Sequence, residues 1–230
     1  MRNPYSSDKI WFLGRSYKEY FSMFNLSFDL LKEEKVLDCA AGASSFTAIA
    51  SKKGIKSTAT DLLYCKDPAT LQKIFKKDLS TLFRIHSGLE HKVNWGFFQN
   101  SEKMIKDRFN TFTNFINDYT KFKERYITAQ LPYLPFNDNQ FTLALSSHLL
   151  FLYDDRLNYQ FHLDSIKEML RVTSEVRIYP LISLRGDGKK SSFVNKIKKD
   201  IIPEGKIKIL DVKYRFREGC NEMMCIKKME

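Results

Sequence analysis

Residues 35–64 read KVLDCAAGASSFTAIASKKGIKSTATDLLY, and this stretch decides the fold. A short apolar run around Asp38 predicts a strand, and the small residues around Gly42 predict a tight turn where backbone approaches a ligand closely. Helix-forming residues follow and stop at Gly54, and a β-branched run then ends at Asp61, about 20 residues beyond the turn. This order of elements, with an acid at that distance, is typical of nucleotide binding, where the acid accepts hydrogen bonds from ribose hydroxyls.

The turn itself indicates which nucleotide is expected. A dinucleotide fingerprint would place glycines at Ala40, Gly42 and Ser45, and only Gly42 matches. Asp38, directly before the turn, also suits a cationic ligand better than a diphosphate. The segment LDCAAGAS resembles motif I of the class I S-adenosylmethionine-dependent methyltransferases, in which an acid is followed by glycines at alternate positions. Asp38 and Gly42 match that motif, Ala40 and Ser44 stand where glycines are usual, and an ordinary turn without a ligand is the alternative.

A second resemblance begins at Gln130. The stretch QLPYLPFNDNQFTLALSSHLLFLYDD is similar to the methyltransferase segment that runs from the end of strand three into strand four. Together with motif I and Asp61, it gives three matches in the order typical of the family, and these cover most of residues 35–155. The family often has an acid where Gln130 stands, so the resemblance implies that the Gln130 carbonyl and the Leu131 backbone N–H bind adenine here.

The resemblance implies S-adenosylmethionine as the cofactor and methyl transfer as the reaction. The turn from Asp38 to Ser44 is then expected to hold the methionyl part. Arg15 is a candidate partner for the carboxylate of the cofactor, because a guanidinium pairs with carboxylates bidentately, and a surface arginine is the alternative. His148, after strand four, is a candidate base, and a histidine that only packs is the alternative. The expected cofactor-binding residues are Arg15, Asp38, Ala40, Gly42, Ser44, Asp61, Leu62, Gln130, Leu131 and Ser146.

The chain is expected to form one domain, residues 1–230, with an α/β, Rossmann-like class I methyltransferase fold. Its mostly parallel, seven-stranded sheet would end in a C-terminal antiparallel hairpin, after a fifth strand over residues 175–184. Residues 1–34 carry aromatic residues at helical spacing and predict an N-terminal helical lid, with Ser16 as the cap of its first helix.

A second helical segment is expected over residues 66–123. Amphipathic patterns begin at Pro68 and Ser101, and a plausible third strand follows only at residues 125–130. In the second of these helices the apolar residues recur at three- and four-residue steps: Ile105, Phe109, Phe112, Ile116 and Tyr119. We therefore predict a helical cap inserted between strands two and three, where it can shape a substrate pocket.

The composition limits the class of partner. The net charge of +11 would suit an anionic partner such as RNA, but the lysines are spread along the chain without a long basic run. The four cysteines show no C-x-x-C pairing, and His86 and His91 lack metal-ligand spacing, so no metal is expected. No signal sequence or membrane-spanning run is evident, and the expected compartment is the cytoplasm. The sequence favours a small-molecule methyl acceptor, with an RNA methyltransferase or a non-catalytic cofactor-binding protein as alternatives.

Overall fold

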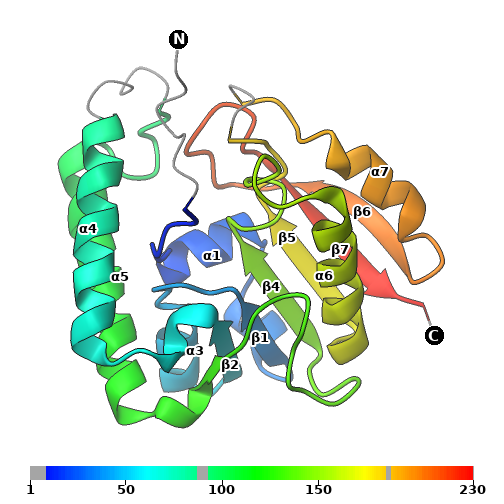
Figure 1. Cartoon of the computed structure of the whole chain (residues 1–230), viewed down its shortest axis with the longest axis horizontal. Helices are drawn as coiled ribbons and strands as arrows, with labels where there is room; N and C mark the ends of the chain where they lie inside the picture. The colour runs from blue at the N-terminus through cyan, green and yellow to red at the C-terminus, as the bar shows by residue number, and fades with distance from the viewer. Residues whose placement is uncertain (1–8, 87–92, 185–187, 230) are drawn as a thin grey trace.

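The computed structural model describes residues 9–86, 93–184 and 188–229 (Figure 1). The lid and cap predicted from the sequence therefore lie partly outside the described residues, as does His91. One seven-stranded sheet has the order β3-β2-β1-β4-β5-β7-β6. Its strands are β1 (Lys35–Cys39), β2 (Lys56–Asp61), β3 (Tyr126–Thr128), β4 (Leu143–Ser147), β5 (Glu175–Tyr179), β6 (Gly205–Asp211) and β7 (Glu222–Lys228).

The first five strands are parallel, and β7 runs antiparallel to both β5 and β6. This arrangement confirms the predicted α/β fold with its C-terminal hairpin. Strand β5 ends at Tyr179, earlier than predicted, because Pro180 follows and has no backbone N–H to donate to a neighbouring strand. Strand β3 is also shorter than the predicted range of 125–130.

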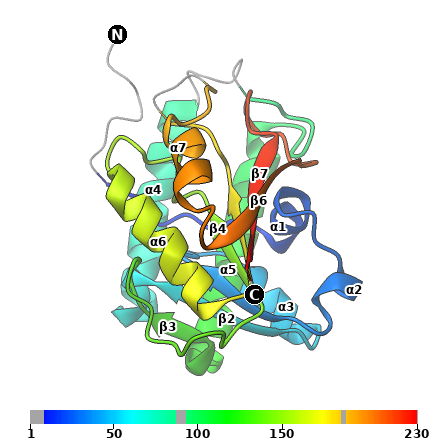
Figure 2. The ribbon, with the colours of Figure 1, turned by 90° about the vertical axis from the view of Figure 1, so that its right-hand side faces the viewer.

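Helices cover both faces of the sheet (Figure 2). Helices α6 (Tyr159–Val172) and α7 (Phe193–Asp200) lie on one face, and α1 (Tyr17–Met23), α2 (Phe28–Leu31) and α3 (Phe46–Lys52) lie on the other. The predicted Ser16 cap is confirmed: its side chain accepts from the Glu19 N–H, and the Glu19 side chain accepts from the Ser16 N–H in return. Within the described residues, no helix is both long and apolar enough to cross a bilayer.

The insertion between β2 and β3 consists of two long helices, as predicted. A short 3-10 turn, η1 (Leu62–Cys65), leads into α4 (Pro68–His86), and α5 (Ser101–Lys121) returns along it, ending in η3 (Lys123–Arg125). Helix α5 packs against α3, and α4 packs against α5. The predicted apolar face of α5 is partly wrong, because Phe109 is 45% exposed, whereas Met104, Arg108 and Phe115 are buried. Arg108 turns inward, and the cause is an ion pair described below.

Candidate functional site

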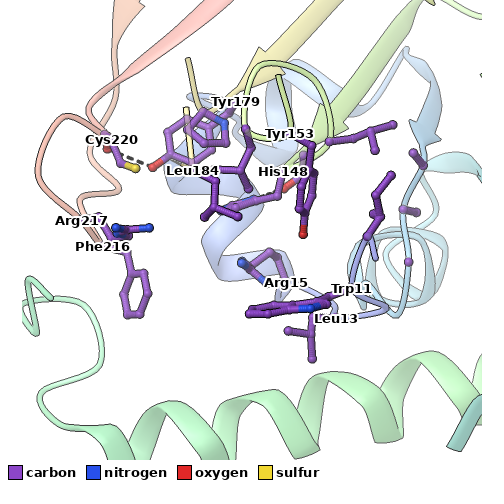
Figure 3. Close-up of a pocket in the computed structure, with 18 of the residues that line it drawn as sticks. Trp11, Leu13, Arg15, His148, Tyr153, Tyr179, Leu184, Phe216, Arg217 and Cys220 are labelled. Atoms are coloured by element: carbon purple, nitrogen blue, oxygen red, sulfur yellow. Dashed lines mark hydrogen bonds between the residues drawn. The ribbon is translucent and has the colours of Figure 1, made fainter. Parts of the chain in front are cut away.

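One pocket lies at the carboxyl ends of the parallel strands, where ligands bind in open α/β sheets (Figure 3). Its lining includes the turn after β1, the last residue of β2, and the residues that follow β4 and β5. Residues 9–15, which we call the N-terminal strap, close another side through Ile10, Trp11, Leu13 and Arg15. Helix α5 contributes Met104 and Arg108, and the β6–β7 connection contributes Tyr214, Phe216 and Arg217.

Asp61 is fixed against the turn after β1. Its Oδ2 accepts a hydrogen bond from the Gly42 N–H at 2.9 Å, and its Oδ1 accepts one from the Leu63 N–H at 2.9 Å. Gly42 has φ of +58°, a conformation that glycine adopts without strain. Burial raises the pKa of Asp61, while these two N–H groups oppose the rise. The carboxylate is therefore held in one orientation, with lone pairs left to accept from a ligand in the pocket.

Asp38 lies behind the turn and is fully buried. Its Oδ1 accepts a hydrogen bond from the Tyr20 hydroxyl at 2.8 Å, and its Oδ2 has no partner within the described residues. Burial raises the pKa of this carboxyl to about 7, and the Tyr20 hydrogen bond offsets only part of the effect. A buried carboxyl oxygen without a donor favours a cation or an N–H group as its missing partner.

The N-terminal strap lies directly on the turn. A Cβ added at Gly14 would lie only 1.9 Å from the Ala43 carbonyl oxygen, so glycine alone permits this approach. The Ser45 N–H donates to the Arg15 carbonyl at 3.2 Å. The Asp78 carboxylate of α4 accepts from the Phe12 N–H at 2.9 Å and from Lys9 Nζ at 2.7 Å. These contacts place the Arg15 backbone beside the N-terminus of α3.

Glu19 of α1 is the centre of a buried charge cluster below the pocket. Arg108 donates to both of its carboxylate oxygens, at 2.5 Å and 2.8 Å, and the Tyr214 hydroxyl donates at 2.6 Å. These groups lower the pKa of Glu19 against the opposing effect of burial. Arg15 lies farther away, with its Nε 3.8 Å from a Glu19 oxygen. Arg108 Nη1 also lies 3.3 Å from a carboxylate oxygen of Asp107, so two arginines and two acids meet in this cluster.

Arg15 has few partners of its own. Its side chain is 17% exposed, its Nη1 donates to the Gly14 carbonyl at 3.4 Å, and its Nε has no hydrogen-bond acceptor within the described residues. A guanidinium carries five N–H donors, so most of the donors of Arg15 remain for a ligand. Burial and the nearby Arg108 lower its pKa, which reflects the cost of holding this cation here.

His148 follows β4 with φ of +59°. Its N–H donates to the Tyr179 carbonyl at 2.7 Å, its Nδ1 lies 2.7 Å from the Ser147 hydroxyl, and its ring meets that of Tyr179 edge-on at 5.5 Å. Burial holds the pKa of His148 well below its usual range, and the charges of Arg15 and Arg108 lower it further. The imidazole is therefore neutral, and its lowered pKa makes it a weaker base than a free histidine.

Comparison with known proteins places the chain in a family. No family model matches it. It is 40% identical over 217 residues to the uncharacterized protein MJ0045 of Methanocaldococcus jannaschii, an alignment that covers 94% of this chain and 95% of that protein. The chain belongs to the MJ0045 family.

Solved structures with low sequence identity share the fold of this MJ0045 family member. The 1,6-didemethyltoxoflavin-N1-methyltransferase of Burkholderia thailandensis, solved with 1,6-didemethyltoxoflavin and S-adenosylhomocysteine, is 13% identical with a TM-score of 0.51. The match covers 92% of this chain and 78% of that enzyme. The PH0226 protein of Pyrococcus horikoshii is 11% identical with a TM-score of 0.50, over 93% and 91% of the two chains. Together with the strand order, these matches show the class I methyltransferase fold.

In this member of the MJ0045 family, the pocket brings together five of the residues selected from the sequence: Arg15, Ala40, Gly42, Asp61 and His148. Three others are buried next to it: Asp38, Ser44 and Ser146. The Ser44 hydroxyl accepts from the Phe46 N–H at 3.0 Å, and the Ser146 hydroxyl has no partner within the described residues.

The remaining three selected residues lie outside the pocket lining. Leu62 is 53% exposed in η1. Gln130 is exposed and pairs through its backbone with Tyr133, and Leu131 is buried in the core. Binding of adenine at Gln130 and Leu131 therefore stays a prediction.

Sequence reasoning missed several residues of the site in this MJ0045 family member. The position of Arg108 could have been predicted from the sequence, because it lies four residues from both Met104 and Phe112 and so shares the inward face of α5 with them. The role of Glu19 at the start of α1 could also have been predicted, because Ser16 and Glu19 have the spacing of a capping box. No local pattern in the sequence indicates Tyr214, because its contact with Glu19 joins positions 195 residues apart.

Proposed function

We propose that the protein is an S-adenosylmethionine-dependent methyltransferase that acts on a small-molecule acceptor. The observation that carries this proposal is the fixed Asp61 carboxylate at the turn after β1, which faces a pocket that also contains Arg15. An acid at the end of the second strand is the group that accepts hydrogen bonds from ribose hydroxyls in nucleotide-binding folds. The fold that the chain shares with the 1,6-didemethyltoxoflavin-N1-methyltransferase supports the proposal.

The residues present suit this cofactor at its charged end. The unpartnered Asp38 Oδ2 has the chemistry to accept from an ammonium, and the under-used guanidinium of Arg15 has the chemistry to bind a carboxylate. S-adenosylmethionine carries both groups on its methionyl part. We assign the ribose to Asp61, and the methionyl part to Arg15 and the turn from Asp38 to Ser44. We keep the prediction from the sequence that Gln130 and Leu131 bind adenine. Leu62 and Ser146 stay predicted as further residues that contact the cofactor.

The chain itself has limited chemistry to perform. When bound, the cofactor supplies a methyl group that is already activated on a sulfonium. The pocket walls orient the acceptor and exclude water, which is the larger part of catalysis for such a transfer. His148, whose Nδ1 lies 2.7 Å from the Ser147 hydroxyl, stays the candidate base for an acceptor hydroxyl or amine, and binding of an acceptor would have to raise its lowered pKa for it to take the proton. The strap and α5 enclose the pocket on two sides, which favours a small acceptor over a duplex nucleic acid.

Calorimetric titration with S-adenosylmethionine and with NAD tests the cofactor assignment. We expect S-adenosylmethionine to bind and NAD not to bind. The affinity should be lost in Asp61→Ala and kept in Asp29→Ala, a change at an exposed acid of α2. A folded protein that binds neither nucleotide, or binds NAD alone, would overturn the proposal.

A second experiment decides between a small-molecule acceptor and RNA. Methyl transfer to total RNA, together with RNA binding that weakens steeply with added salt, would replace the small-molecule part of the proposal. Once an acceptor is known, His148→Gln should lower turnover by about 10²-fold or more, without changing the affinity for S-adenosylmethionine.

A further inference from the structure

The two long helices of the insertion lie side by side at one edge of the molecule (Figure 1). Helix α4 has 19 residues and α5 has 21, so each is about 30 Å long. On α5, Met104 and Arg108 are buried and line the pocket, so the exposed residues of this helix point away from the pocket. We call the solvent-facing side of α4 and α5 the outer face.

The two helices keep their acids engaged and expose their lysines. Three of their four acids already accept hydrogen bonds: Asp78 from the strap, Asp107 from Arg108, and Asp118 from Arg125. The fourth, Glu102, is exposed. All six lysines of the two helices are exposed: Lys73, Lys76, Lys77, Lys103, Lys106 and Lys121. Within the described part of the chain, none of these lysines forms an ion pair with a carboxylate. The outer face is therefore cationic.

Two phenyl rings reach solvent on the same face. On α4, Phe75, Leu79 and Phe83 form a row at four-residue steps, in which the first two are buried and Phe83 is 45% exposed. On α5, Phe109 is equally exposed, and its ring meets that of Phe75 edge-on at 5.7 Å. Phe109 therefore lies where α5 meets α4, and exposed apolar rings stand among the lysines of the outer face.

This combination limits what can bind there. A second copy of the chain would bring like charge, because the net charge of the chain is +11. An RNA methyl acceptor would have to reach the pocket, and the outer face points away from it. Phenylalanine and lysine together are typical of helices that lie in a membrane interface, where the rings enter the acyl boundary and the ammonium groups stay among the headgroups.

We propose that the outer face of α4 and α5 binds the surface of a lipid membrane that contains anionic headgroups. Phe83 and Phe109 would be buried at the acyl boundary, and the six lysines would lie against the headgroups. A lysine near such a surface strengthens binding by about fivefold, and salt weakens this attraction. The proposal goes beyond the proposed methyl transfer and does not depend on it.

Co-sedimentation of the full-length protein with vesicles tests this proposal. We expect the protein to bind vesicles made of equal parts of phosphatidylcholine and phosphatidylglycerol, and not vesicles of phosphatidylcholine alone. Added salt should release it. Phe83→Ser and Phe109→Ser should each weaken binding by about tenfold. The triple variant Lys73→Gln, Lys76→Gln, Lys77→Gln should weaken it by about a hundredfold.

A matched control removes the same charge elsewhere. Lys198→Gln, Lys199→Gln, Lys208→Gln changes three exposed lysines of α7 and β6, and it should bind the mixed vesicles as the unmodified protein does. An equal loss in the two triple variants would overturn the assignment to the outer face.

Two results with the unmodified protein would also overturn the proposal, whether or not the variants fold. One is failure to bind the mixed vesicles, and the other is equal binding to vesicles of phosphatidylcholine alone. RNA that binds through Lys73, Lys76 and Lys77, in a protein that ignores the mixed vesicles, would identify nucleic acid as the partner instead.

Discussion

The buried carboxyl of Asp38 should make the stability of the protein depend on pH. Its pKa is about 7 in the folded chain, because burial disfavours the charged form, whereas an unfolded aspartate has a pKa of about 3.9. Between these values the folded chain keeps a proton that the unfolded chain has released. The free energy of unfolding therefore falls as the pH rises from about 4 to about 7, and this loss is complete at higher pH. The difference in pKa corresponds to about 4 kcal/mol.

Asp38→Asn removes this titration while keeping an oxygen that can accept from Tyr20. Urea unfolding of both proteins should give similar free energies at pH 4, and a gap that grows to about 4 kcal/mol in favour of the variant at pH 8. Tyr20→Phe removes a hydrogen bond to the charged carboxylate, so it should move the titration of Asp38 to higher pH. A gap that stays the same between pH 5 and pH 8 would refute the reasoning.

The same substitution connects stability with the proposed function. If the unpartnered Asp38 Oδ2 serves a cationic group of the cofactor, Asp38→Asn should be more stable at neutral pH and bind S-adenosylmethionine more weakly. Calorimetry on the two proteins measures the second effect directly.

Three further predictions concern the groups around the pocket. Glu19→Gln leaves the buried Arg108 with only the partly exposed Asp107 as a counter-charge, and it should lower the free energy of unfolding by about 3 to 5 kcal/mol in urea, with part of the loss restored by adding Arg108→Met. A loss below about 1 kcal/mol would contradict the ion-pair account. Gly14→Ala forces a Cβ against the Ala43 carbonyl oxygen and should lower both the melting temperature and the affinity for S-adenosylmethionine; an unchanged melting temperature would count against the close packing of the strap. Asp78→Asn weakens the hydrogen bonds that hold the strap, so hydrogen exchange should speed up in residues 9–15 while β1 stays protected; equal exchange in the two proteins would contradict this role.

Features set by neighbouring residues were predicted from the sequence. These features depend on contacts between residues that are close in the sequence. Ser16 caps a helix through Glu19, three residues away, and Gly42 and Asp61 contact each other within one unit of strand, turn, helix and strand. Their backbone consequences are the same in any chain that contains them, because they follow from φ preferences and unsatisfied helix-end N–H groups. The strand order and the C-terminal hairpin were inferred from resemblance to a family, and the structure confirms both.

The inward face of α5 could not be predicted from apolar periodicity alone. The helix turns Arg108 toward Glu19, 89 residues away in the chain, and Phe109 consequently faces solvent. A second buried charged residue of α5, Asp118, accepts from the Tyr126 hydroxyl at 3.0 Å. A pattern of apolar residues places a helix on a core, but buried charges decide its rotation, and their partners lie too far along the chain to be read locally.

The Glu19 carboxylate therefore helps to determine the shape of the pocket. It belongs to α1, and it binds Arg108 of the insertion and Tyr214 of the β6–β7 connection, so three walls from distant parts of the chain meet at one acid. A well-packed apolar contact at this place would cost less desolvation, yet it would not join these three segments through directional hydrogen bonds. Under the proposed function, Arg15 lines the same pocket and would bind the carboxylate of the cofactor. The same buried acid would then fix the walls and, because it accepts hydrogen bonds from Arg108 but only a longer ion-pair contact from Arg15, leave the Arg15 donors available to a ligand.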